Sequence, residues 1–219
     1  MSGALFAVYG ASGCGRGIMP LAREQLRRQG VAQERLVFVD DGAPGSSVNG
    51  QRALSYADFL AEPACERHIV LAIANSAVRE RLAAKCAADG IRAWSVAAAN
   101  VVVMDDAVIG EGFALSPFVT ITSNIRIGRH FHANLYSYVE HDCVIGDFVT
   151  FAPGVKCNGN IVIEDHAYIG TGAVIKQGKP GQPLVIGRGA VVGMGAVVTK
   201  NVPAGATVVG NPARIMNKD

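Results

Sequence analysis

The stretch from residue 103 to residue 176 reads VMDDAVIGEGFALSPFVTITSNIRIGRHFHANLYSYVEHDCVIGDFVTFAPGVKCNGNIVIEDHAYIGTGAVIK and carries an apolar residue at every sixth position. A period of six fits neither an amphipathic helix nor a plain strand, whose periods are about 3.6 and 2. It indicates the hexapeptide repeat of a parallel β-helix. The positions that keep this register without a break are Val103, Ile109, Leu115, Ile121, Ile127, Ala133, Val139, Ile145, Phe151, Cys157, Ile163, Ile169 and Ile175.

A second position of the repeat lies four residues after the first and is mostly small or β-branched. It is occupied by Ala107, Val119, Ile125, Ser137, Cys143, Val149, Val155, Ile161, Ala167 and Ala173. Glycine often follows the first position, as it does at Gly110, Gly128, Gly146 and Gly170. We expect each hexad to form a short strand and a corner, so that three hexads close one triangular coil. A sandwich of short strands would space them irregularly by about 8 to 12 residues, which this register does not do.

The register slips after Ile175 and resumes at Ile186, five residues later than the pattern demands. We therefore expect the segment Lys176–Leu184 to leave a corner as a loop. Pro203, Gly205 and the pair Asn211-Pro212 mark the end of the repeat. The tail to Asp219 is predicted to cap the exposed edge of the last coil.

The first 97 residues have a different pattern, in which apolar runs alternate with helical spacing. We expect strands at residues 4–9, 36–39, 68–74 and 92–96, helices at 19–29, 55–61 and 76–89, a glycine-rich turn at 10–17 and a polar loop to residue 50. This alternation predicts a parallel α/β sheet. The chain then divides into an α/β domain (1–97), a β-helix domain (98–203) and a C-terminal cap (204–219).

Composition narrows the function classes. Half of the 219 residues are hydrophobic and the net charge is +2, without a dense Lys/Arg cluster, which argues against nucleic acid or an anionic membrane as a partner. The five cysteines form no CxxC pair, and Cys143 and Cys157 occupy positions expected to face inward. No basic segment precedes an apolar run at the N-terminus, and no apolar span reaches membrane length. We expect a cytoplasmic protein with reduced thiols.

The glycine-rich turn allows two interpretations. Backbone N–H groups at a helix N-terminus attract anions, so residues 10–17 could cradle a phosphate. The glycines are not a clean GxGxxG and could equally serve tight packing of strand and helix. Asp40 and Asp41, at the end of the next strand, could bind a ribose or a base, or could simply form a turn.

Four histidines lie in the hexads, namely His130, His132, His141 and His166. A zinc site of the γ-carbonic anhydrase type needs two histidines five residues apart, a spacing that this sequence lacks, so we expect no metal. His141 is flanked by Glu140 and Asp142. A carboxylate that accepts from one imidazole nitrogen raises the basicity of the other, which suits a general base. Because such adjacency is common by chance, these residues alone favour a structural role.

Several segments together point to a family. They are residues 9–13 (YGASG), 38–41 (FVDD), 71–75 (LAIAN), 139–146 (VEHDCVIG), 156–160 (KCNGN) and 209–214 (VGNPAR), together with Asn134. Over nearly its whole length the chain resembles the bacterial nucleotide-amino-sugar acetyltransferases, which are related to sialic acid O-acetyltransferases. These proteins join a small Rossmann-like domain to a left-handed β-helix, an exception to the right-handed crossover rule.

The resemblance implies a homotrimer that transfers acetyl from acetyl-CoA to the 4-amino group of a nucleotide-linked deoxysugar, by direct attack without a covalent intermediate. By this resemblance His141 is the general base and Asp142 its partner, Asn134 lies near the acceptor amine, and the Gly159 amide donates to the oxyanion. The positions that match nucleotide-sugar contacts are Ser12, Gly13, Cys14, Asp40, Asp41, Ala74 and Asn75. Those that match acetyl-CoA contacts are Thr150, Thr171 and Met194.

The chain departs from the family pattern at three positions. Cys14 and Thr150 stand where members commonly have histidine, and Ala74 replaces a glycine. These departures bear on the identity of the nucleotide and the sugar more than on the reaction. The alternatives are an O-acetyltransferase of a sialic-acid-like sugar and a non-catalytic β-helix scaffold. The pair His141 and Asp142, together with Asn134, argues against the scaffold.

Overall fold

The computed structural model describes residues 3–42 and 47–216. The chain forms two compact units. The first comprises Met1–Ala99 with Glu111–Ala114, and the second comprises Asn100–Gly110 with Leu115–Asp219.

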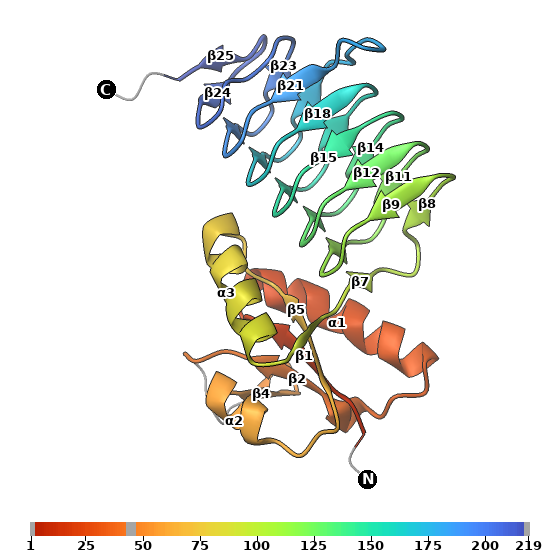
Figure 1. Cartoon of the computed structure of the whole chain (residues 1–219), viewed down its shortest axis with the longest axis vertical. Coiled ribbons are helices and arrows are strands. Elements are labelled where there is room, and N and C mark those ends of the chain that lie inside the picture. The colour runs from red at the N-terminus through yellow and green to blue at the C-terminus, as the bar shows by residue number, and fades with distance from the viewer. Residues whose placement is uncertain (1–2, 43–46, 217–219) are drawn as a thin grey trace. The chain divides into compact units, whose positions relative to one another are not determined.

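The first unit is built on a sheet with the strand order β3-β4-β2-β1-β5-β6 (Figure 1). All its strand pairs are parallel except that of β3 with β4. The central strands LFAVY and LVFV are almost continuously apolar because both faces of the sheet are covered. The strands of this unit are β1 (Leu5–Tyr9), β2 (Leu36–Val39), β3 (Ser47–Val48), β4 (Gln51–Leu54), β5 (Arg67–Leu71), β6 (Arg92–Ala93) and β7 (Val96–Ala97).

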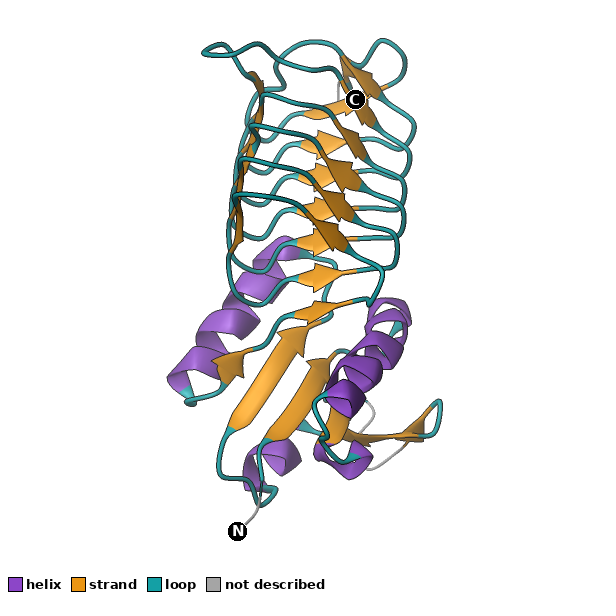
Figure 2. Ribbon diagram, turned by 90° about the vertical axis from the view of Figure 1, so that its right-hand side faces the viewer, coloured by secondary structure: helices purple, strands orange, loops and turns teal. Residues whose placement is uncertain are grey.

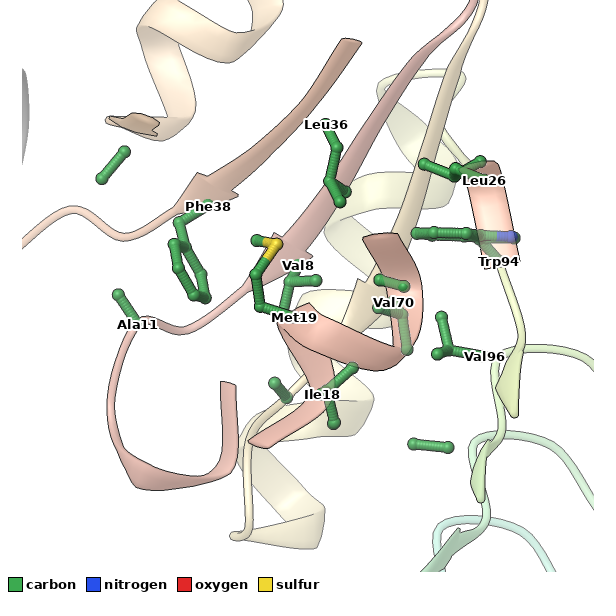
Figure 3. Close-up of a cluster of buried hydrophobic side chains, with 14 residues drawn as sticks. Val8, Ala11, Ile18, Met19, Leu26, Leu36, Phe38, Val70, Trp94 and Val96 are labelled. Atoms are coloured by element: carbon green, nitrogen blue, oxygen red, sulfur yellow. The ribbon is translucent and has the colours of Figure 1, made fainter. Parts of the chain in front are cut away.

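Two apolar clusters hold three helices against this sheet, and the helices are α1 (Gly13–Arg28), α2 (Tyr56–Ala61) and α3 (Ser76–Ala88). Successive strand residues point to opposite faces, so Val8 joins one cluster while Ala7 and Tyr9 join the other. The α1 cluster is drawn in Figure 3, where Met19 points toward Phe38 and Val8. The other cluster takes its helical residues from α2 and α3. A short 3-10 helix (Gln33–Arg35) precedes β2.

Two predictions for this unit are wrong in detail. The first helix begins at Gly13, not at Met19, so that most of the glycine-rich segment is helical. The polar loop to residue 50 contains the β3–β4 hairpin, whose turn residues Asn49 and Gly50 both have positive φ. Asn-Gly is the pair that such two-residue hairpins favour, because its backbone twist matches that of the strands. The residues 43–46 of the predicted loop lie outside the described part.

The second unit is a parallel β-helix, and Figure 2 shows its strands stacked in ladders. One sheet contains β8 (Val102–Val103), β11 (Thr120–Ile121), β14 (Tyr138–Val139), β17 (Lys156–Cys157), β20 (Val174–Ile175) and β23 (Val197–Val198). A second contains β9 (Ala107–Ile109), β12 (Ile125–Ile127), β15 (Val144–Ile145), β18 (Ile161–Ile163) and β21 (Leu184–Ile186). The third runs through β13 (His132–Ala133), β16 (Thr150–Phe151), β19 (Tyr168–Ile169), β22 (Val191–Val192), β24 (Thr207–Val209) and β25 (Arg214–Ile215). Strand β10 (Ala114–Leu115) spans the boundary of the two units in the sequence.

The register of these ladders confirms the predicted coil of three hexads. Residues eighteen apart pair with each other, as Val139 does with Cys157 and Ile145 with Ile163. The hexad positions face inward, and Cys143 and Cys157 are fully buried. Ile109 is only half-buried, and Val103 is 49% exposed. It lies in the first strand of its sheet, so within this unit no earlier coil covers it.

Glycine at the corners is required by the close approach of the next coil. A Cβ atom added at Gly128 or at Gly146 would lie 2.3 Å from the Oδ1 atom of Asp147 or Asp165. Those oxygens accept the backbone N–H of Arg129 at 2.7 Å and of Asp147 at 2.8 Å. Each such corner is therefore closed by a carboxylate where a side chain would otherwise sit.

The residues between β20 and β21 (176–183) form the loop that the register slip predicts, but Leu184, which we assigned to this loop, is already in β21, where it is buried and pairs with Ile161. The N–H of Gly178 donates to the carbonyl of Gly159 at 3.0 Å, and β21 then resumes pairing with β18. The stack continues past residue 203, because β24 pairs with β22. β25 then turns back antiparallel on β24.

Candidate active site

His141 lies at the corner between β14 and β15, directly before Asp142, which belongs to a ladder of polar residues with left-handed backbone. Asp106, Asn124, Asp142 and Asn160 follow one another at intervals of eighteen residues, and all have φ between 51° and 60°. Asn and Asp tolerate this conformation better than most residues because their short side chains bond locally. The repeat thus places a polar side chain at this corner in each successive coil.

The imidazole of His141 is paired with the carboxylate of Asp142. Nδ1 lies 2.7 Å from Oδ2, and the two side chains are 43% and 48% exposed. Because an ionised carboxylate only accepts, Nδ1 carries the proton and Nε2 keeps its lone pair. The hydrogen bond from His141, followed by one from Asn124, holds the pKa of Asp142 below its ordinary value. The pair has the arrangement of a general base and its orienting acid.

Asn124 is a member of this corner that the sequence analysis missed. Its Nδ2 lies 3.3 Å from the Oδ1 atom of Asp142, so the two carboxylate oxygens of Asp142 face two different donors. The signal that could have found it is the spacing of eighteen residues, which stacks Asn124 under Asp142 in the preceding coil.

Gly159 lies against the other side of His141. A Cβ atom built on Gly159 would be 2.5 Å from Cε1, 2.6 Å from Nε2 and 2.9 Å from Nδ1 of the imidazole. The imidazole of His141 occupies the space that a side chain at residue 159 would fill. Of the four predicted catalytic residues, the structure therefore brings together His141, Asp142 and Gly159.

Asn134 lies at a different corner, between β13 and β14. Its Nδ2 donates to the carbonyl of Phe151 at 2.7 Å. Asn158 makes the equivalent bond to Ile175, also seventeen residues ahead, at 2.8 Å. The same type of contact thus satisfies a backbone carbonyl at two different corners. Within one chain, strand β14 separates the corner of Asn134 from the corner of His141.

The predicted acetyl-CoA contacts lie on the same side of the coils as Asn134. Thr171 and Met194 are exposed at the corners that follow β19 and β22, and the Thr171 carbonyl accepts the N–H of Gly195 at 2.8 Å. Their corners are thus stacked in consecutive coils. Thr150 is buried within β16, where its backbone pairs with that of His132 and Tyr168.

In the first unit, the glycines of the turn divide between the two interpretations. A Cβ atom at Gly15 would fall 1.7 Å from the Gly10 carbonyl oxygen, so Gly15 serves close packing of α1 on the turn. A Cβ atom at Gly13 would meet nothing within 4 Å. Ser12 occupies the N-cap position of α1 without a side-chain capping bond, and both Ser12 and Gly13 are exposed. This start of the helix is open enough to receive a ligand.

The two aspartates that follow β2 tie the neighbouring loops together. Asp40 accepts the N–H of Ala11 at 2.8 Å through Oδ2. Asp41 accepts the N–H of Tyr56 at 2.8 Å and the hydroxyl of Tyr9 at 3.2 Å. Asp40 is therefore attached to the glycine-rich turn, whereas Asp41 holds the start of α2.

A buried arginine lies beneath this edge of the sheet, and the sequence analysis missed it. Arg79 is fully buried in α3 and donates to the carbonyls of Ile73 at 2.7 Å and Ala74 at 3.3 Å. Burial lowers the pKa of Arg79 to about 10. Burial also raises the pKa of the Cys14 thiol, and the charge of Arg79 opposes that shift. Asn75 caps α3, because its side chain accepts the N–H of Val78 at 3.0 Å.

Two further predictions were that the chain holds no metal ion and contains no span of membrane length. Within residues 3–42 and 47–216, no group of three or more His, Cys, Asp or Glu side chains is placed to hold a metal ion. In the same part of the chain, no helix has the length and apolar character needed to cross a bilayer.

Comparison with known proteins gives close full-length relatives. No family model matches the chain. GDP-perosamine N-acetyltransferase of Escherichia coli O157:H7 is 52% identical over 214 residues, which are 98% of this chain and 97% of the relative. WeeI from Acinetobacter baumannii AYE is 60% identical, with a TM-score of 0.95 over 97% of this chain and 100% of that structure.

A third relative was solved with a bound ligand. The acetyltransferase domain of PglB from Neisseria gonorrhoeae FA1090, in complex with acetyl coenzyme A, is 29% identical, with a TM-score of 0.83 over 96% of this chain and 98% of that one. The parallel sheets of the second unit and these neighbours fit a left-handed β-helix acetyltransferase.

Proposed function

The chain belongs to the bacterial nucleotide-amino-sugar N-acetyltransferase family, and we propose that it transfers the acetyl group of acetyl-CoA to the 4-amino group of GDP-perosamine. The likeness to a GDP-perosamine N-acetyltransferase over 98% of the chain supports this acceptor. The single observation that supports the chemistry is the bond between His141 and Asp142, which leaves Nε2 of His141 with its lone pair.

The proposed reaction is one nucleophilic addition followed by loss of the thiol. Nε2 of His141 removes a proton from the acceptor amine as the nitrogen attacks the thioester carbonyl carbon. The carbon–sulfur bond then breaks, and the CoA sulfur takes the proton from the imidazolium. The products are an acetamide and free CoA, so that no group remains on the protein.

Gly159 has two roles in this proposal. Its lack of a side chain leaves room for the imidazole of His141. Its backbone N–H donates to the oxyanion that develops on the thioester carbonyl, the kind of preorganised donor that contributes strongly to acyl transfer.

We assign the nucleotide to a Rossmann-like domain formed by residues 1–97, followed by the acyltransferase β-helix, which was predicted to end at residue 203 but continues through β24, and by a cap that is limited to the residues after β24. The open start of α1 at Ser12 and Gly13 suits the diphosphate, because helix N-termini attract anions. Asp40, which holds the N–H of Ala11, lies beside this turn and is the better candidate for the ribose or base. Both aspartates are already hydrogen-bonded, Asp40 to the N–H groups of Ala11 and Gly42 and Asp41 to Tyr56 and Tyr9, so this choice rests on the position of Asp40 beside the turn.

We propose that the chain forms a homotrimer, as the family resemblance implies, and the separation of the predicted site residues supports a site shared between chains. His141 lies at one corner of the coils, whereas Asn134, Thr171 and Met194 lie at another. A site that uses both corners needs one chain to supply the first and a second chain to supply the other. An exposed aromatic stack of Phe118 on Tyr136, with ring centroids 4.9 Å apart, adds apolar surface at that second corner. Symmetric closure of such heterologous contacts produces a ring.

A cytoplasmic location is consistent with the thiols. All five cysteines are free, and Cys86, Cys143 and Cys157 are buried. Disulfides are rare in the cytosol, where thiols are kept reduced.

The direct test is an assay of the purified protein with acetyl-CoA and GDP-perosamine. We expect CoA thiol release, and a product that gains the mass of one acetyl group and resists hydroxylamine, as an amide does. A UDP-linked 4-amino sugar and a sialic-acid-like sugar serve as competing acceptors. A hydroxylamine-labile ester on the latter would favour the O-acetyltransferase instead. Lack of transfer to every acceptor would favour the scaffold.

A further inference from the structure

Three successive coils contribute to the environment of the proposed base. Asn124 belongs to the coil before His141 and Gly159 to the coil after it, so the pair of His141 and Asp142 lies between them. Gly159 takes part in the proposed reaction through its backbone N–H, whereas among the described residues the side-chain amide of Asn124 contacts only Asp142 in this corner.

The chemistry of the two groups settles which way the amide faces. An ionised carboxylate offers only acceptors, so the amide of Asn124 must present its NH₂ group to Oδ1 of Asp142. The other oxygen, Oδ2, accepts from Nδ1 of His141 at 2.7 Å. Two donors on opposite oxygens restrict rotation of the carboxylate about χ2. The orientation of the imidazole then depends on Asn124, although the two side chains need not touch.

The backbone alone does not explain why asparagine occupies this position. Residue 124 has φ of 60°, a conformation that favours Gly, Asn and Asp. Of these three, only asparagine can donate a side-chain hydrogen bond to a carboxylate. One coil earlier the equivalent position is Asp106, whose carboxylate instead pairs with Arg126 at 3.0 Å. The N–H donor of Asn124 therefore matches the carboxylate of Asp142, which lies one coil later.

We propose that Asn124 is a positioning residue, which acts on His141 through Asp142 by holding the carboxylate in the plane that fixes the imidazole. This inference rests on the proposed role of His141 as the base. It predicts that Asn124 affects the turnover number and its pH dependence, and leaves both Michaelis constants nearly unchanged.

Two substitutions separate the donor from the backbone requirement. Asn124→Asp keeps the size of the side chain and its tolerance of positive φ, but replaces the donor with a negative charge. Asn124→Gly keeps the backbone and removes the side chain. Asp106→Gly is the matched control, since it makes the same backbone change at the same corner one coil further from Asp142. The other titratable groups that face this corner, Glu140 and the Cys143 thiol, are common to all the variants.

The first readout is kinetic. Asn124→Gly should lower kcat by roughly 10-fold, the lower end of the range for residues that orient a functional histidine. Asn124→Asp should also move the acid limb of the pH–rate profile to higher pH by about half a unit to one unit, because an added negative charge favours the imidazolium. Asp106→Gly should keep the wild-type profile.

The second readout needs no substrate. Proton and nitrogen NMR of histidine-labelled protein, with the His141 signals assigned from their loss in His141→Asn, gives the titration midpoint of that imidazole directly. We expect the midpoint to rise in Asn124→Asp, which adds a negative charge, and to fall in Asn124→Gly, because a carboxylate that is no longer held pairs less well with the imidazolium. Circular dichroism identifies any variant that fails to fold, in which case the remaining variant decides.

The outcomes distinguish the two hypotheses. If the Asn124 variants leave the NMR midpoint, the acid limb and kcat as in the wild type, the positioning role is wrong, whatever His141 does. If they move the midpoint but His141→Asn keeps full activity, the contact is real and the proposed general base is wrong. Equal losses in Asp106→Gly would mean that any change in the ladder disturbs the corner, which also overturns the specific role of Asn124.

Discussion

The Cα atom of Gly159 lies directly against the imidazole of His141, so that an added methyl group would be 2.5 Å from Cε1 and 2.6 Å from Nε2. The obstacle is a side chain, not backbone, and Gly159 is not among the glycines with positive φ. Alanine at this position would therefore be tolerated by the coil and would displace the ring.

The first prediction is that Gly159→Ala loses activity without unfolding. Moving the imidazole by about 1 Å should lower kcat by about 100-fold, because acid–base groups depend on close positioning. Thermal melting followed by circular dichroism should give a midpoint near that of the wild type. Full activity in Gly159→Ala would show that the ring has another productive position.

Gly146→Ala is the contrasting variant. Its added methyl would meet the Asp165 carboxylate at 2.3 Å and the Asp165 backbone nitrogen at 2.6 Å. The backbone of Asp165 cannot rotate out of the way as a side chain can, so we expect a loss of about 1–3 kcal/mol in the free energy of unfolding. In a chain of this size, that loss lowers the melting temperature by roughly 2–4 °C per kcal/mol.

The β-helix was predictable because its sequence period is strict. A hexad register places every third hexad in contact, so the pairing of Val139 with Cys157 follows from counting alone. The loop at 176–183 was predictable for the same reason, since extra residues must leave the stack without breaking the register. The exposure of Val103 was not predictable in this way, because the period shows which side chains share a face of the coil but not whether another coil covers that face.

The errors in the first unit have local causes. Glycine disfavours helices by about 1 kcal/mol per residue relative to alanine, so the early start of α1 at Gly13 contradicts propensity. Packing outweighs propensity there, because Gly15 must lie against the carbonyl of Gly10. The β3–β4 hairpin was missed although its Asn49-Gly50 turn is a known signal.

Two site residues could not be found from local sequence. Asn124 contacts Asp142 across coils, a relation that appears only when residues eighteen apart are compared. Arg79 lies in the charged run of α3, where an arginine usually faces solvent, yet it is fully buried. Its role is to satisfy the carbonyls of Ile73 and Ala74 at the end of the sheet.

A further prediction concerns stability at low pH. Partial burial tends to raise the pKa of Asp147, but the donors of Arg129 outweigh it and hold that pKa below its ordinary value. The folded value lies below the unfolded one, so the stabilisation is complete above about pH 4 and is lost as the pH falls through the folded pKa. Asp147→Asn should be less stable than the wild type by about 1–3 kcal/mol at pH 7.

Urea unfolding at several pH values tests this prediction. The difference between wild type and Asp147→Asn should shrink steadily below about pH 4. A difference that stays constant from pH 7 to pH 2 would mean that the charge of Asp147 does not stabilise the corner.

The role of the first unit can be tested at Asp40. Asp40→Ala removes the carboxylate proposed to bind the ribose or base, together with the acceptor of the Ala11 N–H. The KM for the nucleotide sugar should rise by roughly tenfold, a typical effect of losing a charged hydrogen-bond partner. The KM for acetyl-CoA should change little. Asp58→Asn, in α2, is the control. Equal increases for both substrates would refute the assignment of the nucleotide to this unit.

The assembly is tested by light scattering at micromolar concentration. We expect a trimer of the 22.8 kDa chain. Mixed trimers that contain both His141→Ala and Thr171→Tyr chains should regain part of the activity, because some sites then receive both wild-type corners. A fully active monomer would contradict a site shared between chains.

The most direct test of the account is the pH–rate profile of wild type beside His141→Ala, measured with GDP-perosamine and saturating acetyl-CoA. We predict that the alanine variant remains folded and binds both substrates, while its kcat falls by roughly two to four orders of magnitude and the acid limb of the profile disappears. A variant whose kcat stays within about threefold of wild type, with the acid limb intact, would contradict the assignment of His141 as the general base.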